Sequence, residues 1–141
     1  MQGLVYLHKQ GAEIILLVRC INAIRNQILQ DKVYLVIEIY IMRSNNSISY
    51  RIIDSEGYPA IYESSNFVIT SNKISNFSLV IKDTSIVFTP ESLYSSKLNE
   101  HHLEGFWGMF IDDNSEAKKL LREVVAELSE QEQFYISFLD F

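Results

Sequence analysis

The amino-acid sequence predicts a single α+β domain over residues 1–141, with an antiparallel sheet of about five to six strands covered by two amphipathic helices. Three observations lead to this prediction. Near the C-terminus, apolar residues recur every three or four positions, as they do on the buried stripe of a helix. Residues 33–88 carry short apolar runs, several of which alternate with polar residues as half-buried strands do. The length and the 48% hydrophobic content suit one domain with its own core.

The clearest predicted element is a helix in the stretch DDNSEAKKLLREVVAELS, residues 112–129. Its apolar positions form one stripe: Ala117, Leu120, Leu121, Val124, Val125 and Leu128. Asp113 or Ser115 is expected to cap its start, and Asp113 with Glu116 resembles a capping box. A helix with such a stripe needs an apolar surface to cover, and the predicted sheet supplies one.

The N-terminal part of the chain allows two interpretations. Apolar residues at helical spacing predict a helix over residues 12–30. Alternatively, residues 4–7 and 13–18 form a β-hairpin around Gln10 and Gly11, followed by a shorter helix. The β-branched residues in this region favour the hairpin, so the sequence leaves helix and hairpin open.

The best predicted strand covers residues 32–42, and its apolar residues on both faces indicate a central strand covered on each side. Strict alternation places the odd-numbered residues, including Ile37, on one face and the even-numbered residues, including Glu38, on the other. Residues 48–54 are expected to return as an antiparallel strand whose solvent side carries Ser49 and Arg51.

Shorter elements are predicted to follow. A piece opened by Pro59 is expected at an edge of the sheet, since proline cannot donate a ladder hydrogen bond. Further strands are predicted at residues 67–70, 77–82, 85–89 and 134–139, with a hairpin at Asp83 and Thr84. Pro90 is expected to open a short helical turn, and residues 97–113 form the least regular part of the chain.

Composition and charge limit the function classes. The net charge is −6, and the acids are concentrated after residue 53, which argues against nucleic-acid binding because that depends on Lys and Arg neutralising phosphates. The chain has no apolar run of about 20 residues for a membrane span and no signal-peptide pattern, so we expect a cytoplasmic protein. The only cysteine, Cys20, lies in an apolar stretch and is expected to be buried and inert.

The sequence contains no recognisable catalytic or cofactor-binding motif. A nucleophile elbow and a phosphate-binding glycine loop are both missing. The residues Glu100, His101, His102 and Glu104 are of metal-ligand type, but adjacent histidines point in different directions, which favours a solvated loop. We therefore expect no metal, no cofactor and no catalytic activity.

Residues 100–116 carry five acids, no Lys or Arg, and the only tryptophan. Two glycines flank the aromatic pair Phe106 and Trp107, which predicts a bent loop that either buries these side chains or presents them as an anchor. The candidate partner-binding residues are Glu100, Glu104, Phe106, Trp107, Asp112, Asp113 and Glu116. Acids also follow one flank of the predicted C-terminal helix, where local stability does not call for them.

In its short length, missing catalytic signature and acidic aromatic segment EHHLEGFWGMFIDDNSE, the chain resembles bacterial immunity proteins of polymorphic-toxin and contact-dependent-inhibition systems. The resemblance rests on general character and implies a protein that neutralises a cognate, basic, nuclease-type toxin. Acids would then steer the toxin, and Phe106 or Trp107 would fill a pocket on it. Two alternatives remain: a secretion chaperone, which predicts a homodimer, and a small enzyme with a site at His101, His102 and Glu104.

Overall fold

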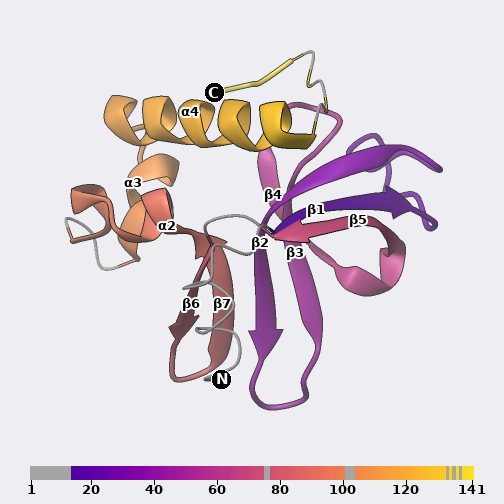
Figure 1. Cartoon of the computed structure of the whole chain (residues 1–141), viewed down its shortest axis with the longest axis horizontal. Coiled ribbons are helices and arrows are strands. Elements are labelled where there is room, and N and C mark those ends of the chain that lie inside the picture. Colours follow the sequence, from indigo (N-terminus) through magenta and orange to yellow (C-terminus); the bar gives the residue numbers. More distant parts are fainter. Residues whose placement is uncertain (1–13, 75–76, 101–103, 133, 135, 137) are drawn as a thin grey trace.

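The computed structural model describes residues 14–74, 77–100, 104–132, 134, 136 and 138–141. They form an α+β fold in which a seven-stranded antiparallel sheet carries a long helix across one side (Figure 1). The elements in chain order are β1 (Ile14–Cys20), β2 (Val33–Met42), β3 (Ile48–Ile53), β4 (Pro59–Glu63), η1 (Ser64–Asn66), β5 (Phe67–Ile74), β6 (Phe77–Ile81), β7 (Ser85–Pro90), α2 (Glu91–Tyr94), η2 (Lys97–Glu100), α3 (Gly105–Ile111) and α4 (Ser115–Glu132).

Strand β2 is the centre of the sheet, and one of its edges has two partners. Its other edge pairs with β3, beyond which lies β4. On the shared edge, β1 pairs with the first half of β2 up to Val36, and β7 pairs with the second half from Ile39 onward. β5 extends the β1 branch and β6 extends the β7 branch. The sheet therefore forks along β2, and the two branches diverge in Figure 1.

Two apolar clusters fill the two faces of the sheet. Between the sheet and the helices, Leu35 and Ile37 of β2 pack with Leu121 and Val124 of α4. Because Leu121 is fully buried and Val124 is 3% exposed, the predicted helix stripe is confirmed as a core element. The opposite face holds a second cluster made of Val18, Cys20, Ile28, Tyr34, Val36, Tyr50, Ile52 and Phe67.

Most predicted strands in the middle of the chain are confirmed. β2 is central with buried residues on both faces, and β4, which begins at Pro59, lies at an edge. β6 and β7 pair as the predicted hairpin, and Pro90 precedes the short helix α2. The single fold class predicted from the sequence, α+β with an antiparallel sheet, is correct.

The predicted helix over residues 12–30 is wrong. Residues 14–20 are strand β1, which is hydrogen-bonded to β2 on one edge and to β5 on the other. Residues 21–32 form a loop with one isolated bridge between Ile24 and Ile28, so the shorter helix of the alternative is also wrong. The proposed hairpin partner, residues 4–7, lies outside the described residues. Cys20 is fully buried as expected, and burial raises the pKa of its thiol.

The cap of α4 differs from the predicted one. The Asn114 side-chain oxygen accepts a hydrogen bond from the Ala117 backbone N–H at 2.9 Å, so Asn114 is the N-cap. Asp113 instead has a left-handed backbone (φ 63°) and forms an ion pair with Lys118 at 2.6 Å. With Asn114 as the cap, Glu116 stands one position too early to complete a capping box.

The C-terminal segment covers the core without forming the predicted strand. Residues 134, 136 and 138–141 have no strand pairing, but Phe134, Ile136, Leu139 and Phe141 pack against the cluster beneath α4. The Asp140 backbone N–H donates to the Gly57 carbonyl at 2.8 Å. Gly57 has φ +78°, and a Cβ there would lie 2.8 Å from Phe138, which explains the glycine at this close approach.

Candidate functional site

The candidate site begins with an irregularity in β2. Up to Ile37 the strand alternates regularly, with Leu35 and Ile37 facing the helices. The register against β3 then shifts between Val36 and Glu38, as at a β-bulge. Because this shift reverses the alternation, Glu38 faces the helices next to Ile37, while Ile39 packs on the opposite face. The strict alternation predicted for this strand is therefore wrong beyond Ile37.

Glu38 is 4% exposed and accepts hydrogen bonds from three side chains. The Trp107 indole N–H donates to Glu38 Oε1 at 2.7 Å, and the Tyr40 hydroxyl donates to the same oxygen. Arg51 donates its Nε–H to Glu38 Oε1 at 3.0 Å and a terminal N–H to the Tyr40 oxygen at 2.9 Å. This network compensates a carboxylate that would be costly to bury alone.

Arg51 is the positive partner in this network. Its guanidinium lies 3.8 Å from the centroid of the Trp107 ring, within cation–π range. The Arg51 and Glu38 side chains are only 13% and 5% exposed, so the ion pair is largely removed from water. Arg51 was predicted on the solvent side of β3. That prediction is wrong because α3 covers this side of the strand with Trp107.

Helix α3 holds Trp107 over the sheet, so the bent loop predicted around Phe106 and Trp107 is wrong. The Asn99 side-chain oxygen accepts a hydrogen bond from the Phe106 backbone N–H at 3.0 Å at the start of the helix. Gly105 has φ +66°, and a Cβ there would lie 2.4 Å from the same Asn99 oxygen. Glycine is thus required for this tight entry into α3. Phe106 is 3% exposed and belongs to the core beneath α4.

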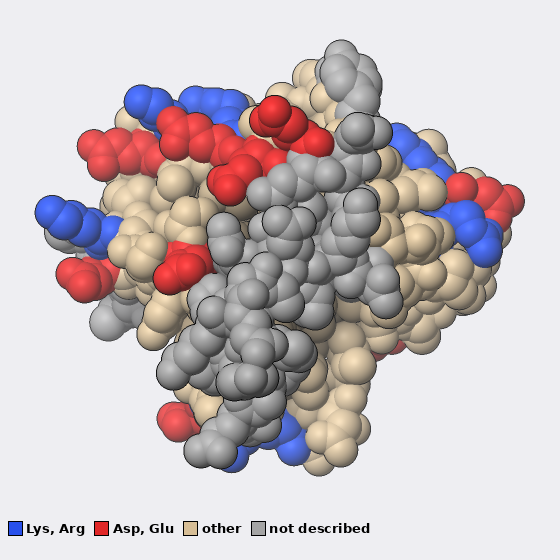
Figure 2. Space-filling view, in the orientation of Figure 1, with Lys and Arg blue, Asp and Glu red and all other residues tan. Residues whose placement is uncertain are grey.

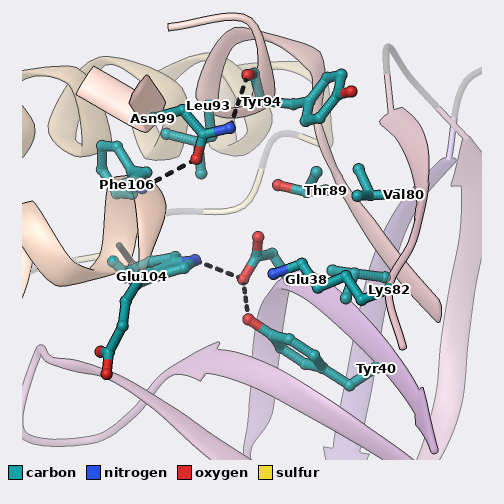
Figure 3. A pocket seen from close by; sticks show the side chains of 12 residues that line it. Glu38, Tyr40, Val80, Lys82, Thr89, Leu93, Tyr94, Asn99, Glu104 and Phe106 are labelled. Carbon is teal, nitrogen blue, oxygen red and sulfur yellow. Dashed lines mark hydrogen bonds between the residues drawn. The ribbon is translucent and has the colours of Figure 1, made fainter. Parts of the chain in front are cut away.

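A small pocket of about 70 Å³ opens beside Glu38 (Figure 3). It lies between β2, the β6–β7 hairpin, α2, η2 and α3, so residues far apart in the sequence meet there. Its lining combines a buried carboxylate, a lysine, a threonine, an amide and several aromatic and aliphatic side chains. The lining residues are Glu38, Tyr40, Val80, Lys82, Val87, Thr89, Leu93, Tyr94, Asn99, Glu104, Phe106 and Trp107.

Stability should fall at alkaline pH because folding raises the pKa of several tyrosines. Burial raises the pKa of Tyr40, and the negative charge of Glu38 raises it further. Burial also raises the pKa of Tyr50 and, together with a hydrogen bond to Asp54, that of Tyr62. In the unfolded chain tyrosine ionises near pH 10, so this stabilisation is complete below about pH 10 and is lost as pH rises above it.

Urea denaturation at a series of pH values from about 8 to 12 measures this effect as a falling free energy of unfolding. Tyr40→Phe should show a shallower fall than the wild type, because one of the shifted groups is gone. A free energy of unfolding that stays constant across this range would contradict the prediction.

The structure divides the predicted partner-binding residues into two groups. Phe106 lies in the core, whereas Trp107 is partly buried and its indole is bound to Glu38. The acids of the set are exposed: Glu100, Glu104, Asp112, Asp113 and Glu116. Among these, only Glu104 joins Phe106 and Trp107 at the pocket. His101 and His102, the centre of the enzyme alternative, lie outside the described residues.

A second feature is an acidic row on α4, which we define as Glu116, Glu123, Glu127 and Glu130. All four are exposed, and successive turns of the helix place them along one flank. In the described part of the chain none of the four forms an ion pair or a side-chain hydrogen bond. Figure 2 shows acidic side chains gathered in the region where α4 runs in Figure 1.

Sequence reasoning missed Glu38, Tyr40 and Arg51 as members of a site. The available signal was one acid inside the otherwise apolar strand VYLVIEIYIM, since a carboxylate in such a strand requires a partner. Glu38 and Arg51 stand opposite each other in the β2–β3 pairing. Trp107 was singled out for another role, and its contacts with Glu38 and Arg51 reveal the present one.

Comparison with protein-family models, curated proteins and solved structures finds no match for this chain. Among the residues that the structure describes, no group of three or more His, Cys, Asp and Glu side chains is placed to hold a metal ion. Within the same residues, no helix is both long and apolar enough to cross a membrane. The acidic row on α4 and the pocket beside Glu38 are therefore the two candidate functional features of the described residues.

Proposed function

We propose that this protein binds and neutralises a basic toxin, as bacterial immunity proteins do, and that the acidic row on α4 is its main contact surface. The observation that carries the proposal is the row itself: four exposed carboxylates on one flank of a helix, with no ion pair between them and the described residues. A protein surface rich in Lys or Arg is the partner that complements such a row.

The requirements of the fold do not explain the row. Glu123 and Glu127 are four residues apart, and Glu127 and Glu130 are three apart, so like charges adjoin along the helix. Such pairs destabilise a helix by about 0.2–0.5 kcal/mol each. Glu130 also lies near the C-terminal end of α4, where the helix dipole favours cations. The buried stripe holds the helix in place despite these costs, which leaves a binding role to account for them.

The acidic row should act mainly on the rate of association, before the two proteins touch. Exposed charges attract an oppositely charged protein over a distance of about 8 Å at physiological salt and so raise the rate of association. The row extends for about 21 Å along α4 at 1.5 Å per residue, enough to meet several cationic side chains at once. Asp112 and Asp113 are also exposed at the start of the helix, with Asp113 in an ion pair with Lys118.

Of the two roles that the sequence allowed for Phe106 and Trp107, burial and a surface anchor, the anchor is not part of this contact surface. Phe106 is in the core, and the Trp107 indole is engaged by Glu38 and Arg51. Trp107→Ala should therefore lower the free energy of unfolding. It should have little direct effect on the binding of the partner. This assignment separates the acids, which we propose to contact the partner, from the aromatic pair, which supports the fold.

Charge reversal of the row tests the proposal. The double variant Glu123→Lys/Glu127→Lys should slow association with a basic toxin by on the order of tenfold at low salt, and the deficit should shrink as salt rises. The probe is the product of the gene beside this one, provided that its expression stops growth and that this protein restores growth. Association and dissociation rates are measured by surface-binding kinetics at several salt concentrations.

The matched control is Glu63→Lys/Asp83→Lys. It makes the same change in net charge at two exposed residues, one on β4 and one in the β6–β7 turn. It should retain an association rate close to that of the wild type. Equal slowing in both double variants would mean that net charge acts rather than the row. If the growth-stopping neighbour is not bound by the wild type, the proposed function is wrong.

A further inference from the structure

One oxygen of the Glu38 carboxylate is turned into the pocket and has no partner among the described residues. The hydrogen bonds from Trp107, Tyr40 and Arg51 all end on Oε1. Figure 3 shows the second oxygen, Oε2, pointing away from Tyr40 into the space lined by Thr89 and Asn99. Because a carboxylate can accept hydrogen bonds on both oxygens, Oε2 is an open acceptor at the inner end of the pocket.

The Thr89 hydroxyl is a second buried group that points into the same space (Figure 3). Thr89 is 5% exposed, and its hydroxyl makes no hydrogen bond within the part of the chain that the structure describes. Neither the Thr89 hydroxyl nor Glu38 Oε2 is among the fully enclosed polar atoms without a partner in the described residues, so both atoms face the open space of the pocket. Two polar groups that have no hydrogen-bond partner among the described residues thus share a pocket that has room for a few small atoms.

Hydrogen-bond donors enter the pocket from other sides. The Lys82 side chain runs toward Glu38 in Figure 3 but forms no ion pair with any described residue. Asn99 uses its oxygen for the Phe106 N–H and one amide hydrogen for the Tyr94 carbonyl, so its second amide hydrogen remains available. The pocket therefore combines an anionic acceptor, a hydroxyl and a cationic donor.

We propose that this pocket binds a small zwitterion of the α-amino acid class. The ligand ammonium donates to Glu38 Oε2 and Thr89 Oγ1, and the ligand carboxylate accepts from Lys82. The aliphatic lining residues Val80 and Leu93 surround the remaining carbon atoms. Because the pocket is small, we use alanine and serine, which have short side chains, as the first ligands to test. This binding site is independent of the acidic row on α4.

Charge complementarity favours a zwitterion over a simple cation or anion. A cation would pair with Glu38 but meet the positive charge of Lys82, and an anion would pair with Lys82 but meet the carboxylate of Glu38. The pocket is lined by the carboxylates of Glu38 and Glu104 and by Lys82, and Arg51 pairs with Glu38 on its other side, so the site as a whole carries no large excess of either sign. A dipolar ligand satisfies both ends of the pocket together.

The single tryptophan makes the test direct. Because the Trp107 indole N–H donates to Glu38, its resonance in a ¹⁵N–¹H spectrum reports on the carboxylate that the ligand binds. Alanine and serine should shift this resonance in a saturable way. Ethylamine and propionate each offer one half of the ligand, and N-acetylalanine blocks the ammonium. All three should bind about tenfold or more weakly than alanine, since each loses charge-assisted hydrogen bonds.

Variants identify which groups bind the ligand. Lys82→Gln changes an exposed side chain and should weaken alanine binding about tenfold while leaving ethylamine binding unchanged or tighter. Lys119→Gln, an exposed lysine on α4, is the matched control and should bind as the wild type does. Thr89→Val should weaken both alanine and ethylamine. Failure of alanine and serine to shift the indole resonance, or wild-type alanine binding by Lys82→Gln, would overturn the proposal. Equal binding of ethylamine and alanine would overturn it as well.

Discussion

Glu38→Ala is expected to lower the free energy of unfolding by about 3–5 kcal/mol, the usual cost of removing one partner from a buried ion pair. Without the carboxylate, the Arg51 guanidinium keeps its charge in a position where its side chain is only 13% exposed. The indole N–H of Trp107 and the hydroxyl of Tyr40 lose their acceptor in the same step. Urea denaturation followed by Trp107 fluorescence measures the change.

A double-mutant cycle with Arg51→Ala separates the ion pair from the rest of the network. The double variant Glu38→Ala/Arg51→Ala leaves no unpaired charge. Its loss in free energy of unfolding should therefore be smaller than the sum of the losses in the two single variants. Glu38→Gln keeps an oxygen acceptor for the indole and should lose less stability than Glu38→Ala. Additive single and double effects would show that Glu38 and Arg51 are not energetically coupled.

Leu121→Ala is expected to lower the free energy of unfolding by about 2–5 kcal/mol. Leu121 is fully buried in the middle of α4 and packs in the cluster formed with β2. Truncation removes buried methyl groups and leaves a cavity that the sheet on one side and the helix on the other cannot fill completely. Val124→Ala removes fewer carbon atoms at a similar depth and should cost less.

The control for this prediction is Glu123→Ala, an exposed substitution on the same helix. It removes a carboxylate from the acidic row and replaces it with a better helix former, so stability should be unchanged or slightly higher. Thermal denaturation of the three variants gives the comparison. If Leu121→Ala unfolds at the wild-type temperature, α4 is not the core element described above.

Periodicity in the sequence predicted the elements whose environment is uniform along their length. The stripe of α4 repeats over three turns against one sheet, and the strand pattern of β2 is regular for its first half. The helical spacing in residues 14–28 led to the wrong prediction of a helix. Apolar residues on both faces of a strand can also fall at that spacing by chance. β1 lies between β2 and β5, and that position depends on pairings that no local pattern reveals.

The candidate site was hidden for a similar reason. Glu38 reaches Trp107 only because the register shift in β2 reverses the alternation, and a bulge leaves no mark in the apolar pattern of that strand. The exposed acids were easier to find, since charge is read directly from the sequence. Phe106 and Trp107 were recognised as unusual in the sequence. In the structure Phe106 packs in the core and Trp107 contacts Glu38, so both support the site and do not form a surface anchor.

The fork in the sheet has a consequence for how the chain folds while it is being synthesised. Residues 14–74 can assemble β1 to β5 as they leave the ribosome, yet the edge of β2 from Ile39 to Met42 stays open until residues 85–90 emerge. An unpaired apolar edge of this kind is a template for pairing with another nascent chain. Fragments that end before β7 should therefore aggregate, and slow translation between residues 43 and 84 would prolong this period of risk.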